Sequence, residues 1–114
     1  MLARARALGP PGTRTLRAAE GDWRALGPGV GIKLLRRDDG SGNMTAFIRM
    51  LPGSSLASHV HTQSEECFLV EGEIFIGDHR LSAADMHVAA AGTAHAAITS
   101  PMGALLLVRA QLCV

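Results

Sequence analysis

Residues 53–72 read GSSLASHVHTQSEECFLVEG, with two histidines one residue apart ahead of two adjacent carboxylates. In an extended strand, side chains two positions apart face the same side. If one regular strand continues through this stretch, His59 and His61 project together, and Glu65 rather than Glu66 shares their side. Two imidazoles and one carboxylate on one face suit a divalent transition metal. A polar strand face would use the same residues, so the alternation alone leaves both interpretations open.

The rest of the chain consists of short apolar segments separated by turn residues. No window shows a long helical period, apart from one turn around RAAEGDWRAL at residues 17–26. The segments that suggest strands include GIKLLRR, MTAFIRML, EECFLVEG, EIFIG and ALLLVRAQL. Many short strands with glycine and proline between them are typical of a β-sandwich or barrel. We therefore predict an all-β fold.

Length and charge narrow the function classes. The 114 residues fit one domain, and the net charge of +1 gives no bulk attraction to nucleic acid or to a membrane surface. No apolar run approaches the ~20 residues that span a bilayer, and the Arg-containing start has no apolar core of a signal peptide. A disulfide between Cys67 and Cys113 stays open, but a reduced cytoplasmic chain is the simpler prediction.

The glycines around the histidine pair complete a longer motif. Gly53 lies six residues before His59 and Gly72 seven after Glu65, which gives G-x5-H-x-H-x3-E-x6-G. Thirty residues after Glu65, the stretch AGTAH ends in His95. The sequence resembles the two-motif pattern of the cupins over most of its length, and it matches the first motif at every defined position.

The second cupin motif, G-x5-P-x-G-x2-H-x3-N in the family, is kept only in part. Gly92 and His95 are retained. Ala84, Ala90 and Thr99 stand where the family has glycine, proline and asparagine. The first two departures affect turn geometry, so we expect the loops there to differ from the family pattern.

The resemblance implies a fold and a ligand set. The fold is a double-stranded β-helix, the cupin jelly-roll barrel, as a single domain over residues 15–114, with residues 1–14 as a flexible or edge-pairing arm. One divalent metal is expected, zinc or iron first and manganese or nickel as alternatives. A tetrahedral zinc would close the site, whereas an octahedral ion would keep two positions open. The expected ligands are His59, His61, Glu65 and His95.

A closer resemblance is to the cupin domain of ChrR-type anti-sigma factors. It is carried by EGDWRALGPGVGIKLLRRD, RMLPGSSLASHVHTQSEECFLVEGE and AGTAHAAITSPMGALLLV. Those proteins add an N-terminal zinc-bound helical domain that grips the sigma factor, and no cysteine or histidine precedes Trp23 here. The resemblance therefore implies a sensory or regulatory module. The alternative is a small metal-dependent dioxygenase or related enzyme acting on a small organic substrate.

Other polar residues are assigned from strand alternation, from the second motif or from a turn. Gln63, Cys67 and Thr99 are candidates for places beside the metal, and none is singled out as catalytic. Cys67 is either a small buried hydrophobe or an oxidisable thiol. His79 is predicted to be solvated in a turn, and His87 to lie on the surface, opposite Met86 and Val88.

The predicted assembly is a symmetric homodimer. An unpaired N-terminal edge and an apolar outer face favour pairing with a second copy. A small-molecule ligand inside the barrel is also compatible with the sequence.

Overall fold

The computed structural model describes residues 9–111, and for His59 and His95 it describes the backbone alone. Within those residues every regular element is a strand, so the all-β prediction is confirmed. The strands are β1 (Trp23–Gly27), β2 (Val30–Asp38), β3 (Asn43–Met50), β4 (Ser54–Leu56), β5 (His59–Val60), β6 (Glu65–Ile76), β7 (His79–Ser82), β8 (Met86–Ala89), β9 (Ala94–His95), β10 (Ile98–Ser100) and β11 (Ala104–Gln111).

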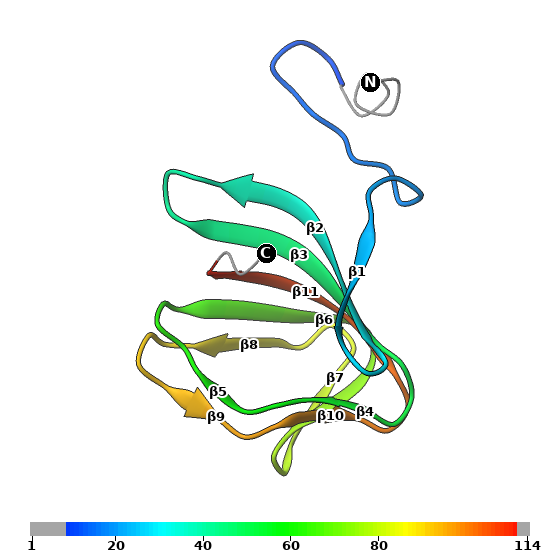
Figure 1. Ribbon diagram of the computed structural model, residues 1–114, viewed down its shortest axis with the longest axis vertical. Coiled ribbons are helices and arrows are strands. Elements are labelled where there is room, and N and C mark those ends of the chain that lie inside the picture. Colours follow the sequence, from blue (N-terminus) through cyan, green and yellow to red (C-terminus); the bar gives the residue numbers. More distant parts are fainter. Residues whose placement is uncertain (1–8, 112–114) are drawn as a thin grey trace.

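The strands wrap into a nearly closed antiparallel barrel. One path of paired strands runs β1-β2-β3-β11-β6-β10-β4, and both β7 and β8 pair with β6. A separate two-stranded ladder joins β5 to β9. In Figure 1, the fan of β2, β3, β11, β6 and β8 forms one wall, and β4, β5, β9 and β10 lie across from it. This arrangement confirms the jelly-roll prediction.

The long strand β6 joins the two walls by bending at Gly72. Its first half pairs with β11 and β8, and its second half pairs with β10 and β7. At the bend, Gly72 has a φ of 87°, and a Cβ built there would lie 2.0 Å from the carbonyl oxygen of Gly103. Only glycine fits both demands. The last glycine of the first motif is therefore the corner of the barrel.

The core follows from strand alternation. Along β11, Ala104, Leu106, Val108 and Ala110 are buried while the residues between them are more exposed. Full burial of a side chain such as Leu106 contributes about 2 kcal/mol. The other buried apolar residues are Val30, Ile32, Met44, Ala46, Met50, Cys67, Leu69, Ile74, Leu81 and Ile98. The apolar faces of the two walls thus supply the interior.

The expectation of one regular strand from residue 59 to residue 67 is wrong. Strand β5 ends at Val60 and β6 begins at Glu65, with a loop between them. The loop forms because the chain around His61 bonds to the turn before β9. The His61 amide donates to the Thr93 carbonyl at 2.8 Å, and the Gly92 amide donates to the His61 carbonyl at 2.6 Å.

Residues 9–22 lead away from the body of the barrel before β1 begins (Figure 1). The segment is tied to β2 by Lys33, which is 3% exposed and whose Nζ donates to the Ala18 carbonyl at 2.8 Å. Residues 1–8 of the predicted arm, and Cys113 at the far end of the predicted domain, lie outside the described residues. The domain boundary at residue 15 stays a prediction. Among residues 9–111, no helix is long and apolar enough to cross a membrane.

Candidate metal centre and its cavity

His61 and Glu65 meet at the entrance to β6. The loop between β5 and β6 turns the His61 ring back toward the first residue of β6, and its Nδ1 lies 3.3 Å from Glu65 Oε2. The His61 side chain is 3% exposed and that of Glu65 is 23% exposed. A buried imidazole beside a partly buried carboxylate is a donor pair suited to a divalent transition metal.

His59 and His95 occupy directly opposite positions on the β5–β9 ladder. Opposed residues on antiparallel strands have Cα atoms about 4.5–5.5 Å apart. The backbone thus brings His59 and His95 together, while their side chains lie outside what the structure describes. Among the described side chains, no group of three His, Cys, Asp or Glu residues is arranged to hold a metal. The four-residue ligand set stays a prediction, and the donor types present at His61 and Glu65 fit it.

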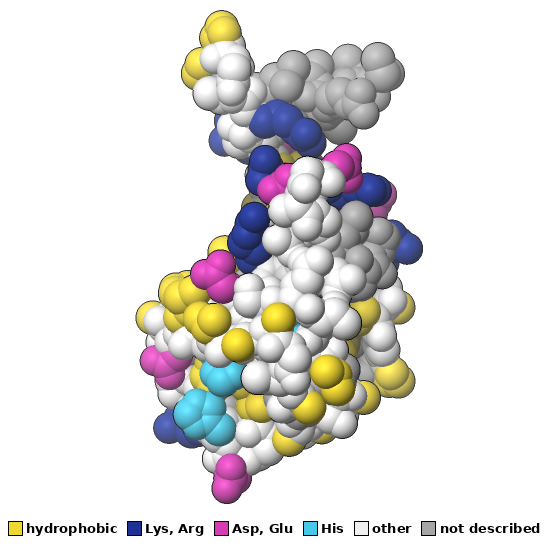
Figure 2. All heavy atoms as spheres, turned by 90° about the vertical axis from the view of Figure 1, so that its left-hand side faces the viewer, with side chains coloured by type: hydrophobic (Ala, Val, Ile, Leu, Met, Phe, Trp, Pro, Cys, Tyr) yellow, Lys and Arg dark blue, Asp and Glu magenta, His cyan; other side chains and the backbone are white. Residues whose placement is uncertain are grey.

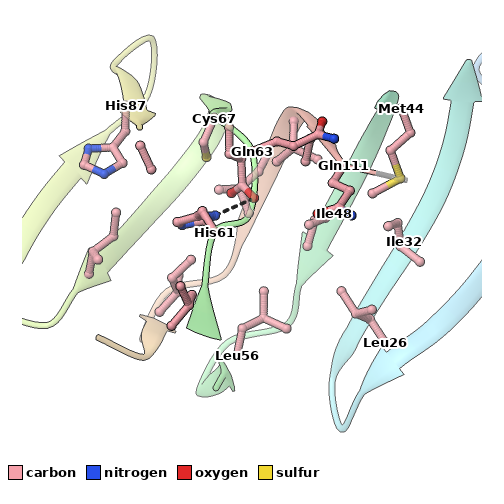
Figure 3. Close-up of a pocket in the computed structure, with 18 of the residues that line it drawn as sticks. Leu26, Ile32, Met44, Ile48, Leu56, His61, Gln63, Cys67, His87 and Gln111 are labelled. Atoms are coloured by element: carbon pink, nitrogen blue, oxygen red, sulfur yellow. Dashed lines mark ion pairs between the residues drawn. The ribbon is translucent and has the colours of Figure 1, made fainter. Parts of the chain in front are cut away.

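The pair opens onto a cavity of about 590 Å³ between the two walls. Figure 3 shows His61 and Cys67 on one side of this space and Ile32, Ile48 and Met44 on the other. A volume of this size is typical of sites for small organic molecules. Its apolar lining residues are Leu26, Ile32, Met44, Ile48, Leu56, Ala57, Val60, Cys67, Ile76, Ala89, Ile98, Leu106, Val108 and Ala110.

Polar groups are few in this cavity. Among the described residues that line it, none is Lys or Arg, and Glu65 is the one carboxylate. Thr62 Oγ1 donates to Gln111 Oε1, which links the loop after β5 to the end of β11. The described polar lining residues are His61, Thr62, Gln63, Glu65, His87 and Gln111.

Cys67 lies in the cavity wall on the same side of β6 as Glu65. It is 7% exposed and makes no disulfide with any described residue. Burial, and next the negative charge of Glu65, raise the pKa of its thiol to about 12. The reactive thiolate is therefore scarce near neutral pH. This environment favours the interpretation of Cys67 as a small buried hydrophobe.

The prediction that His87 lies on the surface is wrong. His87 is half-buried and lines the cavity, directly opposite Cys67 in the β6–β8 pairing. Met86 and Val88 are instead 54% and 59% exposed. The alternation correctly places His87 on the opposite side from its apolar neighbours, but assuming that the apolar pair faces inward reverses the strand. The pairing partner Cys67 decides the direction, and a single strand cannot show it.

The other polar residues discussed from the sequence lie in different surroundings. Gln63 is exposed at the cavity edge and is one of its lining residues. Thr99 is exposed between the buried residues Ile98 and Ser100, and it is not among the lining residues. The structure therefore does not bring Thr99 to the cavity. His79 is exposed, as predicted, although it begins β7 and does not lie in the turn before it; its ring centroid is 5.8 Å from that of His87.

Comparison with solved structures supports this architecture. An acetylacetone dioxygenase from Acinetobacter johnsonii is 18% identical, with a TM-score of 0.77 over 90% of this chain and 76% of that chain. An RmlC-like cupin from Shewanella frigidimarina NCIMB 400 is 21% identical, with a TM-score of 0.74 over 84% of this chain and 88% of that one. A chain in the complex of Rhodobacter sphaeroides SigE with the anti-sigma ChrR is 19% identical, with a TM-score of 0.71 over 90% of this chain and 58% of that one.

At these identities the structural likeness shows the fold alone. No curated protein matches the sequence significantly. The family comes from a different comparison, in which a model of the ChrR cupin-like domain matches residues 12–112. That range includes both motif regions, every strand of the described residues and the cavity. The chain therefore belongs to the ChrR cupin-like domain family.

Proposed function

We propose that this protein is a metal-binding sensory or regulatory module that holds one divalent transition metal at His59, His61, Glu65 and His95. The observation that carries the proposal is the 3.3 Å approach of His61 Nδ1 to Glu65 Oε2, next to the backbone pairing of His59 with His95. A bound metal would supply a Lewis-acidic centre at the edge of the cavity. Zinc and iron are the first candidates, with manganese and nickel as alternatives.

The regulatory role is supported by the family and by the cavity. The chain belongs to the ChrR cupin-like family, and the ChrR of Rhodobacter sphaeroides has been solved in complex with SigE. Of the described lining residues, His87 is the one imidazole besides His61, and no tyrosine or lysine is present to act as an acid or base. A site with few proton-transferring groups suits signal reception better than turnover. A protein partner is part of this proposal.

The second candidate is a small metal-dependent dioxygenase or related enzyme. The observation that favours it is the cavity of about 590 Å³, which is large enough for an organic substrate beside the metal. The fold is shared with an acetylacetone dioxygenase. In this role His87 would be the candidate general acid or base, because it is a polar lining residue on a different strand from His61.

Elemental analysis of protein purified without a metal-binding tag tests the metal site. We expect about one equivalent of divalent metal per chain, and loss of most of it in His61→Ala and in Glu65→Ala. The matched control is His79→Ala, which removes an exposed histidine outside the cavity. Because ligating imidazoles must be neutral, affinity should weaken as pH falls below ~6.5. Unchanged metal content in both site variants would remove the basis of the proposal.

Oxidant exposure and oxygen uptake separate the two roles. A sensor should release metal when peroxide or singlet oxygen modifies a ligand, and mass spectrometry would locate the change. Because Cys67 is buried with a raised pKa, we expect the modification on a histidine ligand, and Cys67→Ser should respond like the wild type. Metal retained after oxidation, together with catalytic oxygen uptake by the iron-loaded protein, would instead establish the enzyme.

Homodimer formation also belongs to the proposal. On the outer face of the β3-β11-β6-β8 wall, Phe47, Leu107, Phe68 and Met86 are register partners that form one apolar row. Phe68 and Met86 are 39% and 54% exposed. A second copy would bury this row. Light scattering at several concentrations should give the mass of a dimer, and a constant monomer mass would refute it. Cytoplasmic location stays a prediction.

A further inference from the structure

We propose that the cavity receives a small amphiphile, with an apolar body between the two walls and a single compact oxygen-bearing head at the His61–Glu65 end. The inference deepens the proposed function, since the head is placed beside the proposed metal. The fit of the apolar part of the ligand depends on the side chains that line the cavity and not on the metal. These two parts make different predictions, so they can be tested separately.

The apolar body follows from the apolar side chains that make up most of the cavity lining. Leu26, Ile32 and Ile48 line the space from β1, β2 and β3, and Leu56 closes it from β4 (Figure 3). None of these side chains can form a hydrogen bond. A hydroxyl or amide placed against them would lose its bonds to water without replacement, which is costly. Sugars and other ligands that are polar along their whole length are therefore disfavoured.

The single head follows from the charges. One carboxylate and neutral imidazoles around a divalent ion would leave a charge of +1, which one monoanionic oxygen group balances. Among the described lining residues, no Lys or Arg offers a second cationic contact. The arginines paired with Glu71, Glu73 and Asp38 lie outside the lining. A second anionic group on the ligand would have no counter-charge inside the cavity.

The outer surface agrees with this assignment. Figure 2 views the molecule from the left-hand side of Figure 1 and shows hydrophobic and histidine side chains close together on the body. Most Lys and Arg side chains in this view gather toward the N-terminal segment. Among the described residues, that face therefore shows no basic cluster over the body that would attract a phosphate or a di-acid.

Calorimetric titration with hexanoate, octanoate, decanoate and octanedioate tests the ligand class. The protein is loaded with manganese(II), an ion that accepts six ligands, at about pH 8, where imidazoles are ordinarily neutral. We expect affinity to rise by about tenfold for every two methylenes until the cavity is full. Octanedioate should bind at least about tenfold more weakly than octanoate, because its second carboxylate has no partner.

A variant that adds a positive charge to the cavity tests whether the missing counter-charge is what excludes a second anionic group. Leu26 lines the cavity from β1 and is 39% exposed, so Leu26→Lys can place an ammonium at the rim with little disturbance of the core. This variant should bind octanedioate at least as well as octanoate. The matched control is Met102→Lys, which adds the same charge at a residue that is 74% exposed and outside this cavity. The control should keep the wild-type preference.

Equal affinity for octanoate and octanedioate in the wild type, or no gain with chain length, would overturn the inference. Elemental analysis of the same samples separates this failure from failure of the proposed metal site. If no metal binds, 1-hexanol and 1-octanol titrated into that protein decide the question. A tenfold stronger affinity for 1-octanol would support the apolar body, and equal affinities would overturn it.

Discussion

Two tight turns flank β8, and they meet the same geometrical demand with different residues. The turn Ser82–Asp85 precedes the strand and Ala90–Thr93 follows it. In each, the amide of the last residue donates to the carbonyl of the first, at 3.0 and 3.2 Å. In each, the third residue has a positive φ, 76° at Ala84 and 85° at Gly92. Glycine adopts this conformation without cost, whereas alanine is strained there by about 1–2 kcal/mol.

The comparison shows that the backbone conformation of the cupin pattern can be kept even where the residue type changes. Ala84 stands where the family has glycine, yet the backbone keeps a conformation that favours glycine. Two hydrogen bonds stabilise this conformation. The Ala84 amide donates to the Leu69 carbonyl at 2.8 Å, and the Ser82 amide donates to Asp85 Oδ2 at 2.8 Å. The second turn also supports the site, since the Gly92 amide bonds to the carbonyl of His61. Strain is tolerated in the turn that has no bond to a predicted metal ligand.

The largest effect is expected where a positive φ coincides with a steric clash. Gly72→Ala should lower the free energy of unfolding by about 3–5 kcal/mol, because strain at φ 87° adds to a Cβ contact of 2.0 Å with the Gly103 carbonyl. Urea unfolding followed by circular dichroism measures it. Gly53→Ala is the matched control, with φ +85° and no atom within 4 Å of the added Cβ. Equal losses of stability in the two variants would mean that the contact with the Gly103 carbonyl adds nothing to the cost of backbone strain.

Gly92→Ala isolates the strain in the turn that bonds to His61. No atom lies within 4 Å of a Cβ at this position, so the expected loss is only about 1–2 kcal/mol. If the metal proposal holds, metal affinity should also fall, because the turn fixes the backbone of His61. Unfolding of the metal-free protein and titration with metal give the two quantities. Unchanged stability would contradict the strain argument for both turns.

Ala84→Gly reverses the comparison and should change stability in the opposite direction. Relief of strain at φ 76° gains about 1–2 kcal/mol, and the extra freedom of glycine in the unfolded chain offsets about 0.5–1 kcal/mol of it. The expected net gain is up to about 1.5 kcal/mol, measured as a higher urea midpoint. Ala83→Gly, one residue earlier in the same turn and without a positive φ, is the control and should lose stability. A loss in Ala84→Gly would show that the turn is not strained.

The smallest effect is expected at the turn between β2 and β3, where a carboxylate rather than a glycine alone stabilises the loop. A hydrogen bond from Ser41 is the largest cause that lowers the pKa of Asp38 below 3.8. The ionised form is therefore favoured by folding. Its contribution is present above pH 3.8 and is lost as pH falls through the lowered folded pKa.

Unfolding of wild type and Asp38→Asn at a series of pH values tests this prediction. The wild type should be slightly more stable near neutral pH, and the difference should shrink below pH 3.8. The Asp38 side chain is partly exposed at the surface, at 31%, where charge interactions contribute little, so the difference will be small. A difference that does not change with pH would assign the effect to something other than ionisation.

The sequence by itself determined the fold class and identified the motif residues. The match of His59, His61, Glu65 and Gly72 to the first cupin motif implied the jelly-roll barrel, although these residues do not lie on one regular strand. The all-β assignment came equally from local information. Short apolar segments between glycines and prolines are typical of paired strands around one core.

Tertiary structure alone decided which way the shorter strands face and what the cavity contains. His87 faces inward because its strand pairs opposite Cys67, and Thr99 faces outward between two buried neighbours. The loop between β5 and β6 exists because His61 bonds to the turn at Thr93. Each outcome depends on a partner at least 20 residues away, which is Cys67 for His87, Phe75 for Thr99 and Thr93 for His61. Alternation fixes which residues share a face, but only pairing between distant strands fixes whether that face is inside.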